Sequence, residues 1–308
     1  MSTPSSVKIV EVGPRDGLQN EKARVPTDVK VELINKLIDA GLSVIEAGSF
    51  VSPKWIPQMA DTRDVFQQCA RMSNVCFPVL VPNLKGLEAA IEAGAKEVAG
   101  FAAASETFSQ KNTNCSIKES LERQQRVCDE AIRSGLRVRG YISVVLGCPY
   151  EGDVNPHVVA NVAEQLYQMG CYEISLGDTV GVGTPQRTKE LFDHVMKVVP
   201  VENLGGHFHD TYGQAIGNIF GALEMGVSIF DSSIAGLGGC PYSPGATGNV
   251  ATEDVLYMLN GMGIKTGVDM NKLLVAAEYI CDHLGRSTYS RAGRALSSKQ
   301  RQSRNILV

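Results

Sequence analysis

The chain has 308 residues, of which 44% are hydrophobic and 20% are charged. This is ordinary globular composition, and it excludes collagenous, disordered and low-complexity proteins. A total of 29 basic and 33 acidic residues gives a net charge of −4, which does not favour a nucleic acid or an anionic membrane as partner. Small neutral or acidic ligands remain open.

The compartment is predicted from the cysteines and from the first residues. Eight cysteines are scattered along the chain without a CxxC pair, which is typical of a reducing compartment. Met1 to Ser6 is polar and has no features of a secretory or mitochondrial leader. No apolar run approaches the roughly 18 residues that a membrane helix needs. We therefore expect a cytoplasmic protein.

Short apolar runs alternate with longer amphipathic segments along nearly the whole chain. This alternation predicts repeated βα units around a parallel sheet. Eight runs, spaced on average about 31 residues apart, predict a (β/α)₈ or TIM barrel. The runs begin near Lys8, Ser43, Asn74, Glu97, Arg137, Tyr172, Asn203 and Ser228.

Helix signals stand between these runs. Thr27 and Asn249 precede apolar-periodic segments as candidate N-caps, and Thr184 is followed by a proline at the first helical position. A further helix is predicted near Asp269 to Leu284, beyond the eighth unit. There it could cover one end of the barrel or join a subunit interface.

No linker divides the chain, so we expect one catalytic domain. The barrel is predicted to span about 7–263, and the additional C-terminal helix and a basic tail about 264–308. From Gly285 onward the chain has six basic residues and no acidic one. This pattern is typical of a solvated, mobile tail or, alternatively, of a patch for the phosphates of a ligand.

Polar residues crowd the predicted C-terminal ends of the strands, where such barrels build their active sites. His207 and His209 are two apart on a strand, so both side chains point to one face. Asp16 after the first run and Asn249 after the eighth would close a ring around them. Two imidazoles, a carboxylate and an amide favour Mg²⁺ or Mn²⁺, with Zn²⁺ or Fe²⁺ open.

Three further residues stand out near this ring. Arg15 offers a planar charge for an oxyanion, or merely a salt bridge to its neighbour Asp16. Glu46, inside an apolar run, is costly to bury unpaired and is expected to pair with Arg15 or to support the metal. Cys240 lies in a glycine-rich segment, where its thiol could be a nucleophile, an acid or a base.

Three segments resemble the 3-hydroxy-3-methylglutaryl-CoA (HMG-CoA) lyase family of TIM-barrel metallolyases. They are IAGLGGCPYSPGATGNVATED from Ile234 to Asp254, VGPRDGLQNE from Val12 to Glu21, and GHFHDTYGQA from Gly206 to Ala215. The similarity extends from about Val7 to Leu284, and the cysteine-containing glycine segment is specific to the lyases within the superfamily.

The resemblance implies metal-dependent retro-Claisen cleavage of HMG-CoA to acetyl-CoA and acetoacetate, the chemistry of leucine catabolism and ketone-body formation. It also implies a homodimer or higher oligomer. The base is left open between Asp16 and His207. The family roles, carried onto this chain, imply a metal on Asp16, His207, His209 and Asn249, substrate contacts from Arg15 and Gln19, support from Glu46 and Asp178, and a catalytic thiol at Cys240.

Other activities stay open at this point. The enzyme could cleave longer 3-hydroxy-3-alkylglutaryl-CoA thioesters, or it could be a related synthase that condenses acetyl-CoA with a 2-oxo acid. Two histidines and one carboxylate could instead hold iron for an oxygenase. A metal-binding barrel without catalysis is the remaining alternative.

Overall fold

The computed structural model describes residues 3–69, 74–239 and 248–306. Within these ranges, nine parallel strands form one sheet in the order β2-β1-β9-β8-β7-β6-β5-β4-β3. The strands are β1 (Lys8–Glu11), β2 (Val44–Ile45), β3 (Gly48–Ser49), β4 (Val79–Leu80), β5 (Glu97–Ala103), β6 (Arg137–Ser143), β7 (Glu173–Asp178), β8 (Leu204–Phe208) and β9 (Ile229–Ser232).

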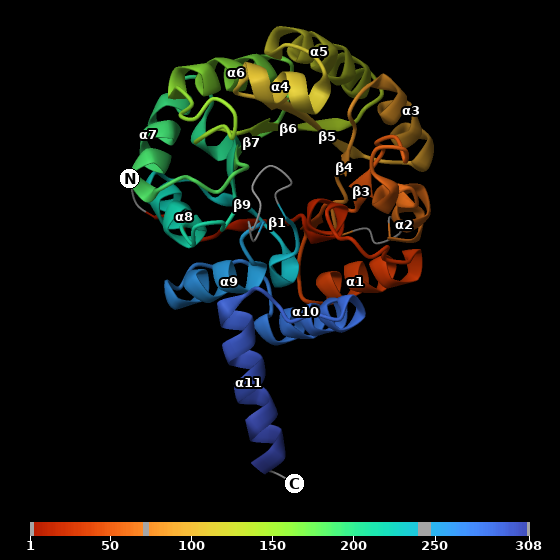
Figure 1. The fold of residues 1–308 in the computed structure, drawn as a ribbon, viewed down its shortest axis with the longest axis vertical. Helices are drawn as coiled ribbons and strands as arrows, with labels where there is room; N and C mark the ends of the chain where they lie inside the picture. Colours follow the sequence, from red (N-terminus) through yellow and green to blue (C-terminus); the bar gives the residue numbers. More distant parts are fainter. Residues whose placement is uncertain (1–2, 70–73, 240–247, 307–308) are drawn as a thin grey trace.

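The two outermost strands in this order are consecutive pieces of one segment, so the sheet closes on itself. β2 pairs with β1, and β3 pairs with β4. Between the two pieces, Glu46 donates its backbone N–H to Glu11 and Ala47 donates to Pro78. Pro78 has no N–H to return, which interrupts the ladder there. The predicted eight-unit TIM barrel is confirmed, with its second strand split in two, and Figure 1 shows the resulting ring.

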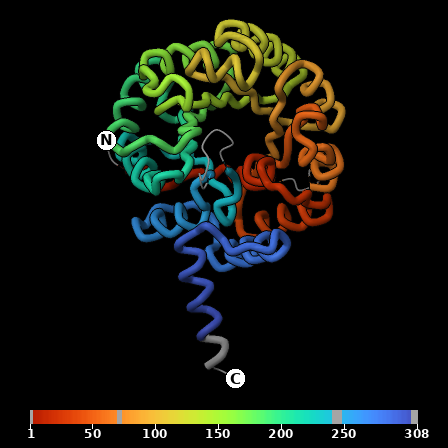
Figure 2. The backbone as a smooth tube through the Cα atoms, viewed as in Figure 1, coloured from red at the N-terminus to blue at the C-terminus, as the bar shows by residue number. Residues whose placement is uncertain are grey.

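Helices surround the ring on its outer side, as the backbone trace in Figure 2 also shows. Local signals fix several of them: α5 begins with a capping box between Ser116 and Glu119, and α6 begins after Asn155 with a proline at its first position. The helices are α1 (Thr27–Asp39), α2 (Thr62–Cys69), α3 (Leu84–Ala93), α4 (Glu106–Thr113), α5 (Ile117–Arg133), α6 (Pro156–Gln168), α7 (Pro185–Val195), α8 (Ala215–Glu224), α9 (Thr252–Gly261), α10 (Met270–Leu284) and α11 (Arg291–Ile306), with short helices η1 (Gly13–Gly17), η2 (Pro57–Met59), η3 (Val201–Asn203) and η4 (Ile234–Gly236).

Two predicted caps are wrong. Thr27 is the first residue of α1 rather than its cap, because Pro26 holds that position and the Thr27 hydroxyl donates to Asp61 at 2.8 Å. Asn249 does not cap α9, which starts at Thr252 after Ala251. Its carboxamide turns instead toward Asp16. In both cases the side chain that the local sequence predicts as a helix cap forms a hydrogen bond with a residue distant in sequence.

The predicted helix over 269–284 is confirmed as α10, which packs against α1. The basic tail is not a loose chain over 291–306, because this segment forms α11, which projects away from the barrel in Figure 1. Asp254 begins α11 by accepting hydrogen bonds from the backbone N–H groups of Arg291 and Ala292 and from the Ser290 hydroxyl. A carboxylate at a helix N-terminus satisfies donors that otherwise lack partners.

The inside of the barrel is charged, whereas barrels of this type are usually filled with branched apolar side chains. Arg139 of β6 is fully buried, and it pairs with Glu173 of β7 at 2.6 Å and with Asp231 of β9 at 2.7 Å. Lys8 of β1 also pairs with Glu173. These alternating charges form a ladder inside the barrel, from the partly exposed Lys8 at the start of β1 to Asp231 beside His207.

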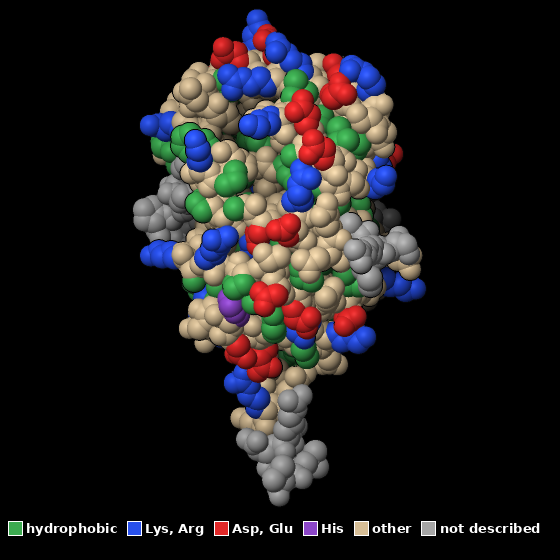
Figure 3. All heavy atoms as spheres, turned by 90° about the vertical axis from the view of Figure 1, so that its right-hand side faces the viewer, with side chains coloured by type: hydrophobic (Ala, Val, Ile, Leu, Met, Phe, Trp, Pro, Cys, Tyr) green, Lys and Arg blue, Asp and Glu red, His purple; other side chains and the backbone are tan. Residues whose placement is uncertain are grey.

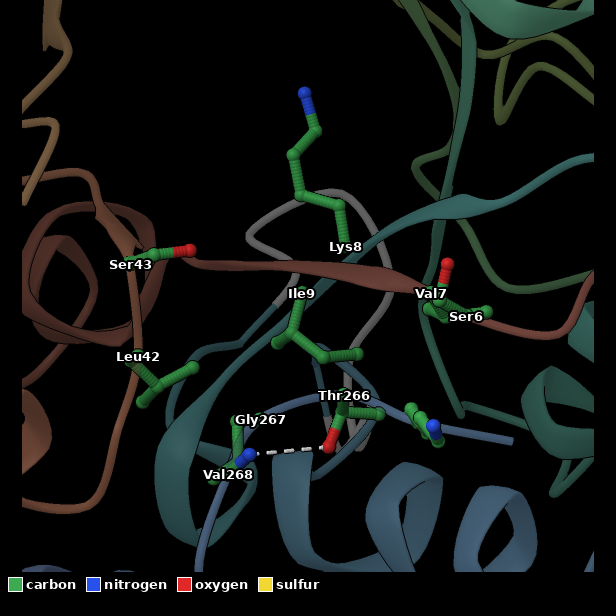
Figure 4. Close-up of a pocket in the computed structure, with 10 residues that line it drawn as sticks. Ser6, Val7, Lys8, Ile9, Leu42, Ser43, Thr266, Gly267 and Val268 are labelled. Carbon is green, nitrogen blue, oxygen red and sulfur yellow. Dashed lines mark hydrogen bonds between the residues drawn. The ribbon is translucent and has the colours of Figure 1, made fainter. Parts of the chain in front are cut away.

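The two ends of the barrel differ in character. At the N-terminal end, a pocket of about 320 Å³ is bordered by the start of β1 and by the loop after α9 (Figure 4). Its lining mixes apolar residues such as Ile9 and Leu42 with polar ones such as Lys8 and Lys265. The polar residues predicted for the site lie at the opposite end.

The outer surface mixes charges of both signs, as Figure 3 shows for one face. No helix within the described ranges is long and apolar enough to cross a membrane.

Candidate active site

His207 and His209 lie at the C-terminal end of β8 and face the inside of the barrel. His207 pairs in register with Gly177 of β7 and Asp231 of β9, while the intervening Phe208 packs into the outer apolar core. This is the alternation expected of a strand. The two imidazole rings lie 5.4 Å apart between centroids.

Asp16 completes a cluster with the two histidines. Each of the three residues offers a ligand atom, and these atoms lie within 4.8 Å of one another. Asp16 reaches this position because β1 ends in a turn of π-helix over Gly13–Gly17, which lifts the loop over the mouth of the barrel. Asn249, across the mouth, donates from Nδ2 to Asp16 Oδ2 at 2.7 Å. The structure therefore brings together all four residues predicted as metal ligands.

The charge states of Asp16 and His209 suit a divalent cation. Burial alone would raise the pKa of Asp16, but Arg15 and then the two histidines outweigh it and lower that pKa to about 2. Burial, followed by the nearby His207, lowers the pKa of His209 to about 4. Asp16 is therefore ionised and His209 neutral at pH 7, which are the forms that bind metal ions.

His209 also provides an independent sign of a missing partner. Its Nδ1 is buried and has no hydrogen-bond partner within the described residues. A buried polar atom without a partner is costly, and coordination to a cation would remove that cost. The donor set and this orphaned nitrogen both fit a metal ion bound between Asp16, His207 and His209.

Arg15 lies beside this cluster and is held by two carboxylates. Its Nε donates to Glu46 Oε2 at 2.6 Å, and its Nη1 donates to Asp16 Oδ1 at 2.7 Å. The guanidinium also lies over the ring of Tyr141, 5.7 Å from its centroid. The contact at 2.6 Å confirms the predicted pairing of Arg15 with Glu46. Glu46 is fully buried.

Asp178 does not join the cluster. It pairs in register with the outward-facing Phe208, and its carboxylate accepts from the backbone N–H groups of Val182 and Gly183 at 3.2 and 2.8 Å. Burial raises its pKa to about 6. The structure thus places Asp178 where its carboxylate holds the loop after β7, outside the cluster of Asp16 and the two histidines.

Of the other two predicted site residues, the structure describes Gln19 and not Cys240. Gln19 follows the π-helical turn, and its buried Oε1 has no partner among the described residues. It is free to bind a ligand, and its role stays a prediction. Cys240 lies outside the described residues, so its predicted thiol chemistry is untested.

Sequence analysis missed the groups beneath the histidines. His207 Nδ1 lies 3.1 Å from Asp231 Oδ2, and Ser175 donates to the same oxygen at 2.8 Å. Tyr141 lies edge-on to His207. Polar residues at alternate positions of otherwise apolar strands, as in RVRGY and SIFDSS, could have indicated these groups. Alternate positions of a strand share one face, which here is the barrel interior.

The fold and the site together define a (β/α)₈ barrel enzyme with a candidate metal centre at the C-terminal mouth. A family model described as HMGL-like matches residues 6–280. The chain therefore belongs to the HMGL-like family, which is enzymatic and metal-dependent.

Individual relatives agree with this assignment over nearly their whole length. A Pseudomonas aeruginosa protein named 3-hydroxy-3-isohexenylglutaryl-CoA/hydroxy-methylglutaryl-CoA lyase is 60% identical, and the match covers 97% of this chain and 100% of the relative. A crystal structure of hydroxymethylglutaryl-CoA lyase from Pseudomonas aeruginosa superposes with a TM-score of 0.95 at 60% identity, over 97% of this chain and 100% of that one.

A third relative was solved with a ligand. It is an HMG-CoA lyase from Acinetobacter baumannii in complex with coenzyme A and 3-methylmalate. It is 37% identical with a TM-score of 0.90, over 96% of this chain and 97% of that one.

The site predicts that the imidazole of His209 is needed for metal binding. His209→Ala should weaken Mn²⁺ binding by more than the roughly 10 to 100-fold that loss of an outer partner costs, because a direct ligand is lost. Titration calorimetry of chelator-stripped protein measures this affinity. His157→Ala, which changes an exposed histidine of α6, is the control and should bind as the unaltered protein does. Equal affinities in all three proteins would place the ion elsewhere.

Proposed function

We propose that this chain cleaves 3-hydroxy-3-methylglutaryl-CoA to acetyl-CoA and acetoacetate, using the cluster at the barrel mouth. The observation that carries the proposal is that Asp16, His207 and His209 converge beside Arg15. The chain is at the same time 60% identical, almost end to end, to a lyase named for this substrate. A synthase, an oxygenase or a non-catalytic barrel has no such support.

We propose Mg²⁺ or Mn²⁺ as the ion, held by Asp16, His207, His209 and Asn249. Mixed imidazole, carboxylate and amide donors without thiolate favour these ions. When bound, the ion would act as a Lewis acid and template for the substrate's tertiary hydroxyl and carboxylate. All other steps fall to the side chains of the chain itself.

Cleavage of the bond between C2 and C3 requires removal of the hydroxyl proton, and it leaves the enolate of acetyl-CoA. The candidates for accepting that proton are Asp16 and His207, and His207 can accept it only while its Nε2 is not bound to the ion. Glu46 and Asp16 engage Nε and Nη1 of Arg15, which leaves Nη2 to donate to the enolate oxygen. We assign the final protonation of the enolate carbon to the Cys240 thiol, and the support of the loop after β7 to Asp178.

The acyl group accepted by the site is a finer question. The relative from Pseudomonas aeruginosa is named for two thioesters, one with a methyl and one with an isohexenyl substituent. We propose HMG-CoA as the main substrate and cleavage of longer 3-alkyl analogues as a second activity. We further propose a homodimer in the cytoplasm; the scattered cysteines support a reducing compartment.

The direct test is an assay of purified protein with Mg²⁺ and HMG-CoA, with acetyl-CoA and acetoacetate measured as products. We expect both products in equal amounts, loss of turnover on chelation, and recovery with Mg²⁺ or Mn²⁺. The isohexenyl analogue, assayed in parallel, measures the second activity. Absence of acetyl-CoA from metal-loaded, folded protein would refute the proposal.

The role of Arg15 predicts that Arg15→Lys slows turnover even though the positive charge is kept. A lysine cannot bind Glu46 and Asp16 and still present a planar donor to the enolate. The loss in kcat should be about 10²- to 10³-fold, as for other oxyanion donors. Steady-state kinetics measures it, and Arg63→Lys, which changes an exposed ion pair on α2, is the control. An unchanged kcat would reduce Arg15 to a structural ion pair.

The role of Cys240 predicts an acid rather than a covalent nucleophile, because no acyl group has to be held on the enzyme. A thiol of ordinary pKa, near 8.5, is mostly protonated at pH 7. Cys240→Ala should keep metal binding and lose roughly 10² to 10⁴-fold in kcat, and Cys240→Ser should also be slow. Mass spectrometry of protein quenched during turnover should show no acyl adduct. A kinetically competent thioester on Cys240 contradicts this role.

A further inference from the structure

We propose that Asp231 is a positioning residue that fixes His207 with its proton on Nδ1, so that Nε2 faces Asp16 and His209. This inference deepens the proposed function, since it concerns the same metal site. It assigns a role to a buried carboxylate that does not itself contact the substrate. Its evidence lies in the hydrogen bonds beneath the histidines and in the charge ladder that anchors them.

Asp231 is 1% exposed and lies directly beside His207 on the neighbouring strand. The two residues are partners in the register of β8 and β9, so both side chains point into the barrel. Its carboxylate is shut off from water. The sheet, and not a loop, therefore sets the position of Asp231 relative to His207.

The hydrogen bonds of Asp231 determine which His207 nitrogen carries the proton. Its Oδ1 accepts from Arg139 Nη2 at 2.7 Å, and its Oδ2 accepts from the Ser175 hydroxyl at 2.8 Å and from Arg139 Nη1 at 3.3 Å. Both partners donate in these contacts, so the carboxylate is an acceptor. The contact at 3.1 Å must then be donated by His207 Nδ1. In the neutral imidazole, the form that metal binding requires, the lone pair is therefore on Nε2.

The ladder below holds Asp231 in place. Arg139 is shared between Asp231 and Glu173, and Glu173 is also paired with Lys8 at the start of β1. Two positive and two negative side chains alternate, so the row is neutral overall and each buried charge has an opposite neighbour. A buried charge needs such pairing to persist. The carboxylate under His207 is thereby held by Arg139, in addition to the Ser175 hydroxyl.

The second histidine has no such support. His209 Nδ1 is buried without a hydrogen-bond partner among the described residues. The two imidazoles are therefore unequal: His207 is oriented before an ion arrives, whereas His209 is oriented by the ion itself. Pre-orientation of one ligand by a carboxylate is worth roughly 10 to 100-fold in metal affinity.

A purely structural role for Asp231 would consist only in neutralising Arg139. Glu173 gives the matched comparison, because it also pairs with Arg139, at 2.6 Å, and is buried to a similar degree. Glu173 makes no contact with His207. Asp231→Asn and Glu173→Gln thus each remove one carboxylate charge beside Arg139, and only the former replaces the anionic acceptor of His207 Nδ1 with a neutral amide.

The test measures Mn²⁺ affinity by calorimetry on metal-stripped protein, and the His207 tautomer by nitrogen NMR of histidine-labelled protein. Asp231→Asn should bind Mn²⁺ about 10 to 100-fold more weakly and show a smaller share of the tautomer protonated on Nδ1, because a neutral amide stabilises it less than a carboxylate does. Glu173→Gln should keep the affinity and the tautomer of the unaltered protein. Neither readout needs turnover, so failure of this inference is distinguishable from failure of the proposed lyase activity.

Two results would overturn the proposal. One is an unchanged Mn²⁺ affinity in folded Asp231→Asn, and the other is an equal loss in Glu173→Gln. If Asp231→Asn does not fold, Ser175→Ala replaces it, because it removes one donor to Asp231 Oδ2 without removing a charge. Ser175→Ala should weaken Mn²⁺ binding measurably, and unaltered affinity and tautomer in that variant contradict the proposal.

Discussion

A guanidinium buried inside the barrel is the constraint on which the rest of the site depends. Arg139 has almost no access to water, so it needs carboxylates, and Glu173 and Asp231 supply them from the two sides. An uncompensated buried charge costs several kcal/mol. Satisfying Arg139 places a carboxylate under His207, and His207 in turn stands beside Asp16 and His209. The arrangement of side chains at the mouth of the barrel therefore depends on the buried ion pairs of Arg139.

The sequence carries the fold strongly and the site in part. Strand starts near Lys8, Glu97 and Arg137 could be predicted because apolar runs recur at the spacing of one βα unit. The pair His207 and His209 could be predicted because strand alternation puts both on one face. Both predictions rest on patterns between residues that are close in sequence, and the folded structure keeps these patterns.

The remaining parts depend on contacts between distant segments. Asp231 looks like an isolated acid in an apolar run, and only the register of β8 and β9 places it beside His207. Asn249 looks like a helix cap from its neighbours in sequence, and only the expected closure of the barrel predicted it near Asp16, to which it bonds across 233 positions. Asp178 looks like a site residue because it ends a strand, but strand alternation turns its carboxylate toward the loop after β7. No local pattern encodes these pairings.

The central claim is that Asp16, His207 and His209 hold a divalent ion above the buried charges. Crystals grown with Mn²⁺, measured at a wavelength where manganese scatters anomalously, locate that ion directly. The account predicts one strong anomalous peak between these three side chains, with His207 Nε2 toward the ion and Nδ1 toward Asp231. A peak elsewhere, or a His207 ring turned so that Nδ1 binds the ion, would contradict it.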